Sequence, residues 1–181
     1  MISKGQLLLS EPFMLDPNFK RSVVLLTDHE EEGSIGFVLN QKSNYKITDL
    51  LDDIGEFDAD VYIGGPVSTN TLHFLHSVGD LIEESIPVCR GIWWSGDFDA
   101  MKFLILQGVI KQDNIRFYLG YSGWSEGQLQ EELNEKAWIV EPMDPNYLFK
   151  KDPDQLWKEV MNSKGHTFSA LSQLDGDHIF N

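Results

Sequence analysis

Ser125 is the residue whose surroundings come nearest to a catalytic motif. It is the serine of Gly123-Trp-Ser-Glu-Gly127, a G-x-S-x-G string between a predicted strand and a predicted helix, where an esterase places its nucleophile. The order nucleophile, acid, histidine leaves His166 and His178 as the available bases. Ser125 also stands three residues before Gln128, the spacing of a capping box, in which the serine hydroxyl accepts from the helix backbone. We favour the helix cap over the nucleophile.

The remaining histidines and the cysteine suggest structural roles. His73 and His76 would share one face of a helix, but three residues apart on the strand that we expect they point to opposite faces. A pair also lacks the further ligands of a zinc site. His29 precedes Glu30-Glu31-Glu32, an imidazole beside carboxylates that is typical of a solvated hairpin loop, and Cys89 has the apolar context of a buried thiol. We therefore expect no catalytic residue, metal or cofactor.

Glycine-rich segments and tryptophans mark a candidate binding surface. Gly64-Gly65-Pro66 opens a loop that could present backbone N–H groups to an anion, although no lysine follows it as in a P-loop. The alternative, which we favour, is a turn that needs these residues for its shape. Trp124 and the Trp93-Trp94 pair could line a groove or seal a core. The candidate ligand or partner surface comprises Arg21, Gly64, Gly65, Pro66, Gly123 and Trp124.

The composition indicates an acidic globular chain. Its 181 residues carry 29 Asp and Glu against 14 Lys and Arg, a formal net charge of -15, and the densest basic groups are only pairs. We therefore expect no direct nucleic-acid binding. No stretch reaches the roughly 20 apolar residues that cross a bilayer, and the N-terminus lacks a signal-peptide pattern. The single Cys89 precludes an intrachain disulfide, which fits a cytoplasmic location.

The hydrophobic pattern predicts strands and short helices around a central unit at residues 114–140. This unit comprises a strand over 115–121, a tight corner at 122–124, a helix from 126 to about 136, and a strand over 137–140. The pattern predicts further strands at 6–10, 22–27, 34–40, 60–63, 71–78 and 88–94. It predicts further helices capped by Thr48, Asp97, Asp144 and Asp152, and a last weak helix over 167–173.

Two details concern the arrangement of these elements. The nearly continuous apolar run at 22–27 predicts a central strand, which forms an antiparallel hairpin with 34–40 in which Gly36 marks a bulge or a close backbone contact. No linker or repeat interrupts the sequence. We therefore expect one domain over 1–181 with one core, and a peripheral tail beyond about 165.

Several segments together resemble the bacterial AlgH/YqgE family. The resemblance rests on Gly5 to Pro12, Asp16 to Leu26 with His29, Gly33 to Asn40, Gly64 to Val67, and Gly120 to Leu129 with Trp138. It implies an α+β fold with a bent, bifurcated, mixed or antiparallel β-sheet that forms a pseudo-barrel with helices packed outside. It also implies a cytoplasmic bacterial protein. The family name carries an association with transcriptional regulation, but the resemblance brings no catalytic residue, cofactor or ligand.

The absence of a complete catalytic constellation favours a non-enzymatic regulatory or protein-binding module. Such a module would have a protein partner and would influence transcription only indirectly. The rival hypothesis is a small-ligand-binding protein or a hydrolase-type enzyme that uses the surface around Gly65, Gly123 and Trp124. The shape of that surface discriminates between the two, because a deep pocket with convergent polar groups indicates a ligand.

Overall fold

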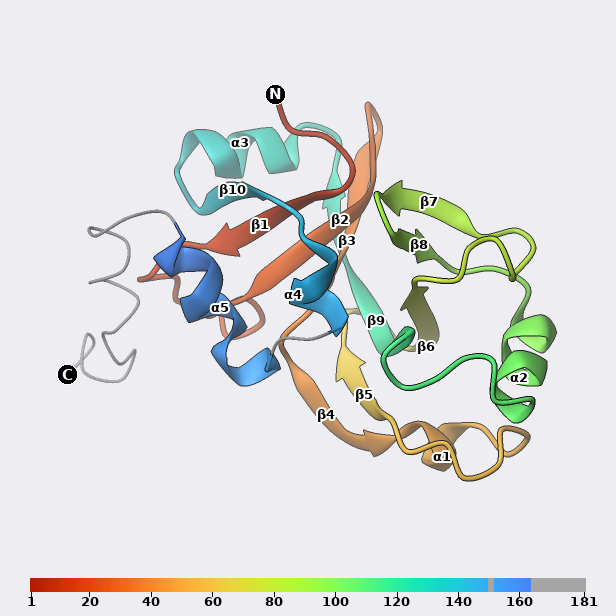
Figure 1. Cartoon of the computed structure of the whole chain (residues 1–181). Coiled ribbons are helices and arrows are strands. Elements are labelled where there is room, and N and C mark those ends of the chain that lie inside the picture. Colours follow the sequence, from red (N-terminus) through yellow and green to blue (C-terminus); the bar gives the residue numbers. More distant parts are fainter. Residues whose placement is uncertain (150–151, 164–181) are drawn as a thin grey trace.

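The computed structural model describes residues 1–149 and 152–163 (Figure 1). The predicted helix over 167–173, the peripheral tail, His166 and His178 lie outside the described residues. The strands are β1 (Gln6–Ser10), β2 (Val23–Glu30), β3 (Gly33–Val38), β4 (Lys42–Lys46), β5 (Asp60–Ile63), β6 (Val67–His76), β7 (Ile86–Cys89), β8 (Ile92–Trp94), β9 (Ile115–Ser125) and β10 (Trp138–Pro142). The helices are α1 (Ile47–Leu50), α2 (Phe98–Leu106), α3 (Gln128–Asn134), α4 (Pro145–Phe149) and α5 (Pro153–Asn162).

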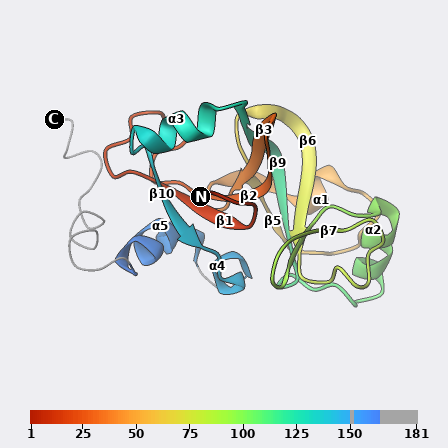
Figure 2. The same cartoon turned by 90° about the horizontal axis from the view of Figure 1, so that it is seen from above.

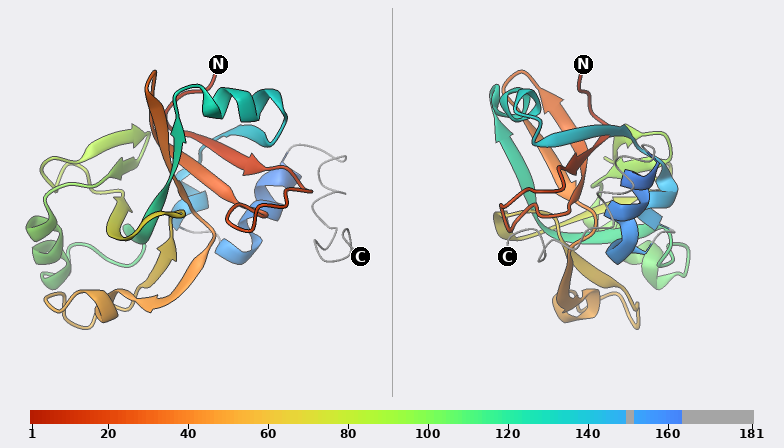
Figure 3. Two further views of the ribbon diagram at one scale, coloured as in Figure 1. Left: turned by 180° about the vertical axis from the view of Figure 1, so that it is seen from behind. Right: turned by 90° about the vertical axis from the view of Figure 1, so that its left-hand side faces the viewer.

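One long strand, β9, joins two parts of a ten-stranded sheet whose main path runs β10-β1-β2-β3-β9-β6-β8-β7. Its first half pairs with β5 in parallel and with β6 in antiparallel fashion, whereas its last four residues pair with β3. Figure 3 shows β9 running from between β5 and β6 up to the β2–β3 hairpin. The sheet is therefore bifurcated at β9, as expected, and among the described strands it does not close into a barrel.

The β2–β3 hairpin has the predicted central position. Val24 pairs with Val38 and Glu30 with Gly33, and the register shifts between Leu26 and Asp28. Opposite this bulge, a Cβ added to Gly36 would lie 2.9 Å from the carbonyl oxygen of Leu25. The prediction of a bulge or a close contact at Gly36 is confirmed by both features.

Within the described part of the chain the core consists of three clusters, where the sequence suggested one. The largest lies between the sheet and helices α4 and α5, and includes Leu9, Leu25 and Trp157. A second fills the space between α1, α2 and strands β5, β6 and β9. A third lies under α3 on the opposite face of β1 and β2, and Figure 2 shows α3 on one side of these strands and α4 and α5 on the other. A central sheet covered on both faces necessarily divides the core.

Three local predictions were wrong. β9 continues as one strand through Ser125, because residues 122–125 pair with β3 and form no corner. Residues 88–94 form the hairpin β7–β8, since Gly91 turns the chain with a φ of 80°. The first helix is capped at Lys46 and not at Thr48, because the Asp49 side chain accepts from the Lys46 N–H at 2.8 Å. Tertiary pairing and one glycine decided these boundaries.

Candidate functional site

A hollow of about 520 Å³ lies at the tip of the β2–β3 hairpin, and we call it the hairpin pocket. It is lined by Asp28, Glu30, Glu32, Gly33, Ser34, Ile35, Val67, Tyr121, Gly123, Trp124 and Ser125. The pocket forms where β9 leaves β5 and pairs with β3, so the bifurcation of the sheet creates it. Five of its lining residues, Glu30, Glu32, Val67, Gly123 and Ser125, are exposed, which shows that the pocket is open to solvent.

The strand register puts the floor of the pocket on one face of the sheet. Ile35 is paired with Gly123 and also with Asp28, and Val67 is paired with Tyr121. Directly paired residues share a face. Gly123 carries no side chain and lies beside the Tyr121 ring and Val67, since an added Cβ would be 3.5 Å and 3.9 Å from their atoms. The missing side chain is what leaves the floor hollow.

The pocket combines an apolar floor with an acidic rim. Ile35, Val67 and the Tyr121 ring form the floor, and the carboxylates of Asp28, Glu30 and Glu32 lie at the rim. None of the described residues that line the pocket is a Lys, Arg or His. Carboxylates near an aromatic ring attract a cation through charge and through the quadrupole of the ring. The pocket therefore suits a cationic group attached to an apolar body.

The Gly64-Gly65 segment packs closely against the backbone of β9. Gly64 donates its N–H to the Leu119 carbonyl at 2.8 Å, and its own carbonyl accepts from the Val38 N–H and the Ser122 hydroxyl. A Cβ on Gly65 would lie 2.3 Å from the carbonyl carbon of Tyr121. Gly64 and Gly65 are buried and Pro66 is exposed. The favoured interpretation, a turn that requires glycine for its shape, agrees with this geometry.

Trp124 holds the sheet to α3. Its indole Nε1–H donates to Oε2 of Glu132 at 2.8 Å, and the indole of Trp138 donates to the same oxygen at 2.8 Å. The two rings pack edge to face with centroids 6.0 Å apart. Each tryptophan is 5 % exposed. Trp124 therefore mainly seals the cluster under α3, although it is also among the residues that line the pocket.

Ser125 is the last residue of β9 and does not cap α3 in the way predicted. The cap is Gly127, whose φ of 76° is in the left-handed region. Gln128 does reach back, because its Oε1 accepts from the Ser125 N–H at 3.0 Å, but the Ser125 hydroxyl donates to that same oxygen at 3.3 Å. Of the two hydrogen bonds of a capping box, only the one from the Ser125 N–H to the Gln128 side chain is present. A serine bound in this way has no histidine partner among the described residues.

The sequence reasoning did not identify a pairing between His29 and Ser34. His29 Nδ1 lies 2.6 Å from the Ser34 hydroxyl, across the β2–β3 hairpin. Ser34 is 6 % exposed. It pairs with Trp124 and so shares its face, which is opposite to that of Ile35 and Gly123. The pair therefore lies on the other side of the sheet from the pocket floor.

His73, His76 and Cys89 occupy packed surroundings. The His76 Nε2 lies 2.7 Å from the Ser95 carbonyl, and burial lowers the pKa of this imidazole. His73 packs against Phe37, and burial lowers its pKa as well. Burial raises the pKa of the Cys89 thiol, which disfavours the reactive thiolate. Within residues 1–149 and 152–163 there is no group of three or more His, Cys, Asp or Glu side chains that could hold a metal ion.

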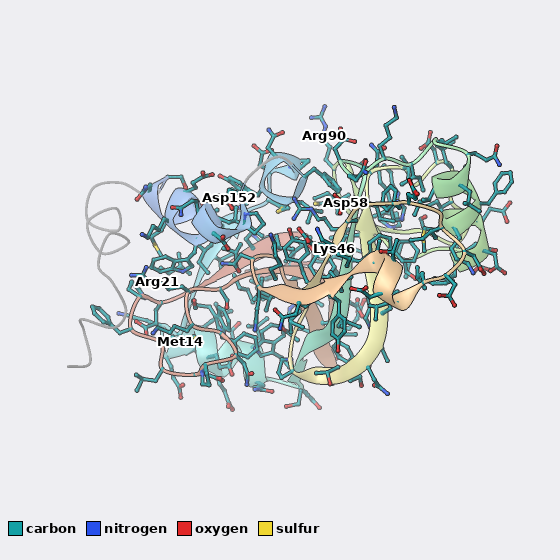
Figure 4. All side chains as sticks on the ribbon, turned by 90° about the horizontal axis from the view of Figure 1, so that it is seen from below. Met14, Arg21, Lys46, Asp58, Arg90 and Asp152 are labelled. Carbon is teal, nitrogen blue, oxygen red and sulfur yellow. The ribbon has the colours of Figure 1, made fainter. Side chains whose placement is uncertain are left out.

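Arg21 is far from the hairpin pocket along β2. It lines a separate hollow of about 310 Å³ with Lys20 and Asn40, and its guanidinium carbon lies 5.0 Å from the centre of the Trp157 ring. Figure 4 shows Arg21 on the side of the molecule near α5. The structure thus separates the six candidate residues. Gly123 and Trp124 line the hairpin pocket, Gly64, Gly65 and Pro66 form the glycine segment before β6, and Arg21 lines this second hollow.

Sequence reasoning missed the acidic rim of the candidate site and the structural role of Glu132. Asp28, Glu30 and Glu32 were visible as a polar hairpin loop, but only the register of β3 with β9 shows that they surround an apolar floor. The sequence pattern alone predicts that Glu132 lies on the solvated face of its helix. The two nearby tryptophans, Trp124 and Trp138, whose indole N–H groups need acceptors, were the available signal.

Comparisons with known proteins agree with this architecture. Residues 7–169 match the DUF179 family, described as AlgH-like. A UPF0301 protein of Chlorobaculum tepidum is 41% identical over 95% of this chain and 92% of its own, and one of Cytophaga hutchinsonii is 37% identical over 100% of both.

Two solved structures have the same fold. A protein of Corynebacterium diphtheriae has a TM-score of 0.83 at 19% identity, covering 96% of this chain and 93% of its own. The AlgH protein of Pseudomonas aeruginosa has a TM-score of 0.74 at 30% identity over 95% and 94% of the two chains. By sequence and by fold, the chain belongs to the AlgH-like family.

Proposed function

We propose that this protein is a non-enzymatic regulatory module that binds a basic, apolar segment of a protein partner in the hairpin pocket. The observation that supports the proposal is the acidic rim of Asp28, Glu30 and Glu32 around the floor of Ile35, Val67 and Tyr121. A lysine or arginine side chain suits both parts, because its apolar stem packs on the floor while its charge faces the carboxylates.

The expected energetics are those of a weak, reversible interaction. A cation over an exposed aromatic ring contributes about 0.5–1 kcal/mol, and more when the ring is desolvated. The rim carboxylates act mainly on the association rate and on the choice of partner. Because these charges are exposed, salt screens them beyond about 10 Å at 0.1 M ionic strength. Binding should therefore weaken as the salt concentration rises.

The net charge of the protein also bears on its partners and on its location in the cell. A net charge of -15 disfavours direct contact with DNA, so any effect on transcription would pass through a protein partner. We propose a cytoplasmic location, supported by the sequence features given above. No helix among the described residues is long and apolar enough to span a bilayer.

The decisive experiment fills the pocket. Gly123→Val adds a side chain where a Cβ meets only ordinary contacts, at 3.5 Å or more, and β-branched residues suit strands. A fluorescein-labelled peptide rich in arginine and leucine serves as the probe, with fluorescence anisotropy as the readout. We expect Gly123→Val to weaken binding at least about tenfold, equivalent to about 1.4 kcal/mol. Asn44→Val, at an exposed position of β4, is the matched control.

A second set of variants tests the rim. Asp28→Asn, Glu30→Gln and Glu32→Gln together should weaken binding of the same peptide and remove most of its salt dependence. The control carries three neutral substitutions at exposed acids elsewhere, at Asp113, Glu131 and Glu135. Wild-type affinity in both Gly123→Val and the triple rim variant would refute the proposed site.

The rival function is a small-ligand-binding protein or a hydrolase. The pocket volume falls within the roughly 300–1,000 Å³ of small-molecule sites, and the His29–Ser34 distance of 2.6 Å is that of a base and a nucleophile. Burial of Ser34 and its position on the opposite face argue against hydrolysis in this pocket. Labelling of Ser34 by a fluorophosphonate, lost in His29→Asn, would support the hydrolase instead.

A further inference from the structure

Helix α2 presents an apolar face to solvent at the end of the molecule opposite α3 and α5 (Figure 1). Its inner face buries Met101 and Ile105. On the outer face Phe103 is 59% exposed and Leu106 is 55% exposed. These two residues are three apart and therefore adjacent on the helix surface. A helix that is apolar on both sides is ordinarily covered on both sides, so this face lacks a covering element within the described chain.

A groove adjoins this face. A hollow of about 210 Å³ lies between the end of α2 and the segment before β5, lined by Ile54, Gly55, Glu56, Phe57, Ile105 and Leu106. Gly55 has a φ of 68°, and a Cβ placed on it would lie 3.6 Å from the Leu106 side chain. The absent side chain at Gly55 keeps the groove open beside Leu106. We call Phe103, Leu106 and this groove the α2 face.

The charges around the α2 face are predominantly negative. Asp53, Glu56 and Asp99 are exposed. The ammonium of Lys102 lies 3.4 Å from Asp53 and 3.8 Å from Asp99, so its charge is compensated within the protein. An apolar strip with acidic borders is complementary to an amphipathic helix whose apolar side chains are flanked by lysine or arginine.

We propose that the α2 face is a docking site for a basic amphipathic helix of a partner protein. Two other occupants fit less well. A second copy of this chain would bring together two molecules of net charge -15, which repel each other. An anionic membrane surface would meet the same carboxylates. This site is separate from the hairpin pocket, and the proposal stands whether or not that pocket binds a partner.

The test uses a designed peptide of about 18 residues, built from leucine, alanine and lysine with leucines at helical spacing and a fluorescent label. We expect wild-type protein to raise its anisotropy, and the double variant Phe103→Ser with Leu106→Ser to weaken binding at least about tenfold. Both positions are exposed, so the variant should keep the thermal midpoint of the wild type. The control is Leu15→Ser, a residue 71% exposed in the loop next to Met14, on the other side of the molecule (Figure 4).

Three outcomes would overturn the proposal. The double variant could bind the lysine peptide as well as the wild type does. A peptide with glutamate in place of lysine could bind equally, which would show apolar adhesion without charge recognition. Sedimentation could reveal a dimer that the double variant abolishes, in which case a second copy is the occupant. The Gly123→Val variant should bind this peptide normally, which separates the result from that for the hairpin pocket.

Discussion

Glu132 is a side chain whose removal should strongly destabilise the fold. One oxygen, Oε2, accepts both the Trp124 and the Trp138 indole N–H at 2.8 Å. Glu132→Ala leaves two nearly buried donors without an acceptor. A hydrogen bond to a charged group contributes about 1.5–3 kcal/mol. Because the carboxylate is only half-buried, we take the lower figure for each bond and expect a loss of about 3 kcal/mol.

The Glu132→Gln variant separates the contribution of the negative charge from that of the hydrogen-bond geometry. Its amide oxygen can still accept both indole bonds, but neutral hydrogen bonds are roughly half as strong, so we expect a loss of about 1.5 kcal/mol. Glu131→Ala, an exposed neighbour on α3, should stay within about 0.5 kcal/mol of the wild type. Alanine favours helix at both positions, so helix propensity does not confuse the comparison.

The assay is urea unfolding followed by tryptophan fluorescence, with thermal unfolding as a check. For a chain of this size a change of 1 kcal/mol shifts the midpoint by about 2–4 °C, so Glu132→Ala should lower it by about 6–12 °C. If Glu132→Ala and Glu131→Ala proved equally stable, the shared acceptor would have no energetic role and the reasoning would be refuted.

Three further predictions follow from the same structure. Gly65→Ala should cost about 3 kcal/mol or more in unfolding free energy, because its Cβ would meet the Tyr121 backbone at 2.3 Å; a soluble variant with wild-type stability would contradict this. Ser125→Ala should change stability by less than about 0.5 kcal/mol, since Gly127 forms the cap. If urea unfolding showed the loss typical of a removed helix cap, the interpretation of Ser125 as the cap of α3 would be restored. Burial lowers the pKa of His76 below its ordinary value, so its contribution to stability is complete above about pH 6.5 and is lost as the pH falls through the lowered pKa. The stability difference between wild type and His76→Asn should therefore shrink on acidification, and a constant difference from pH 8 to pH 5 would count against it.

Short-range patterns predicted most elements of this fold. The strands at 6–10 and 60–63 and the helix capped by Asp97 have the expected positions, because periodicity, glycine and a capping side chain act over a few residues. The Asp97 carboxylate accepts from the Ala100 N–H at 3.0 Å, as the sequence indicated. The predicted AlgH/YqgE resemblance is confirmed by the family match over residues 7–169.

Pairing between strands that are far apart in the sequence determined the features that local patterns did not predict. Residues 122–125 have the composition of a turn, yet β3 supplies hydrogen-bonding partners along the strand and keeps them extended. The hairpin pocket arises from the same pairing, so no local signal located its floor. The α2 face was not predicted, because Phe103 and Leu106 showed their exposure only in the folded chain.

The position of β9 late in the chain has a consequence for biosynthesis. Strands β3, β5 and β6 all leave the ribosome before residues 115–125, and each needs that segment as a neighbour. Until then their N–H and C=O groups have no partner on that side, and such unpaired edges are sites of aggregation during folding. Pairings this distant in sequence also form slowly, typically within milliseconds to seconds. A nascent chain halted before Ile115 should therefore remain dependent on chaperones, whereas release beyond Ser125 should allow both halves of the sheet to form together.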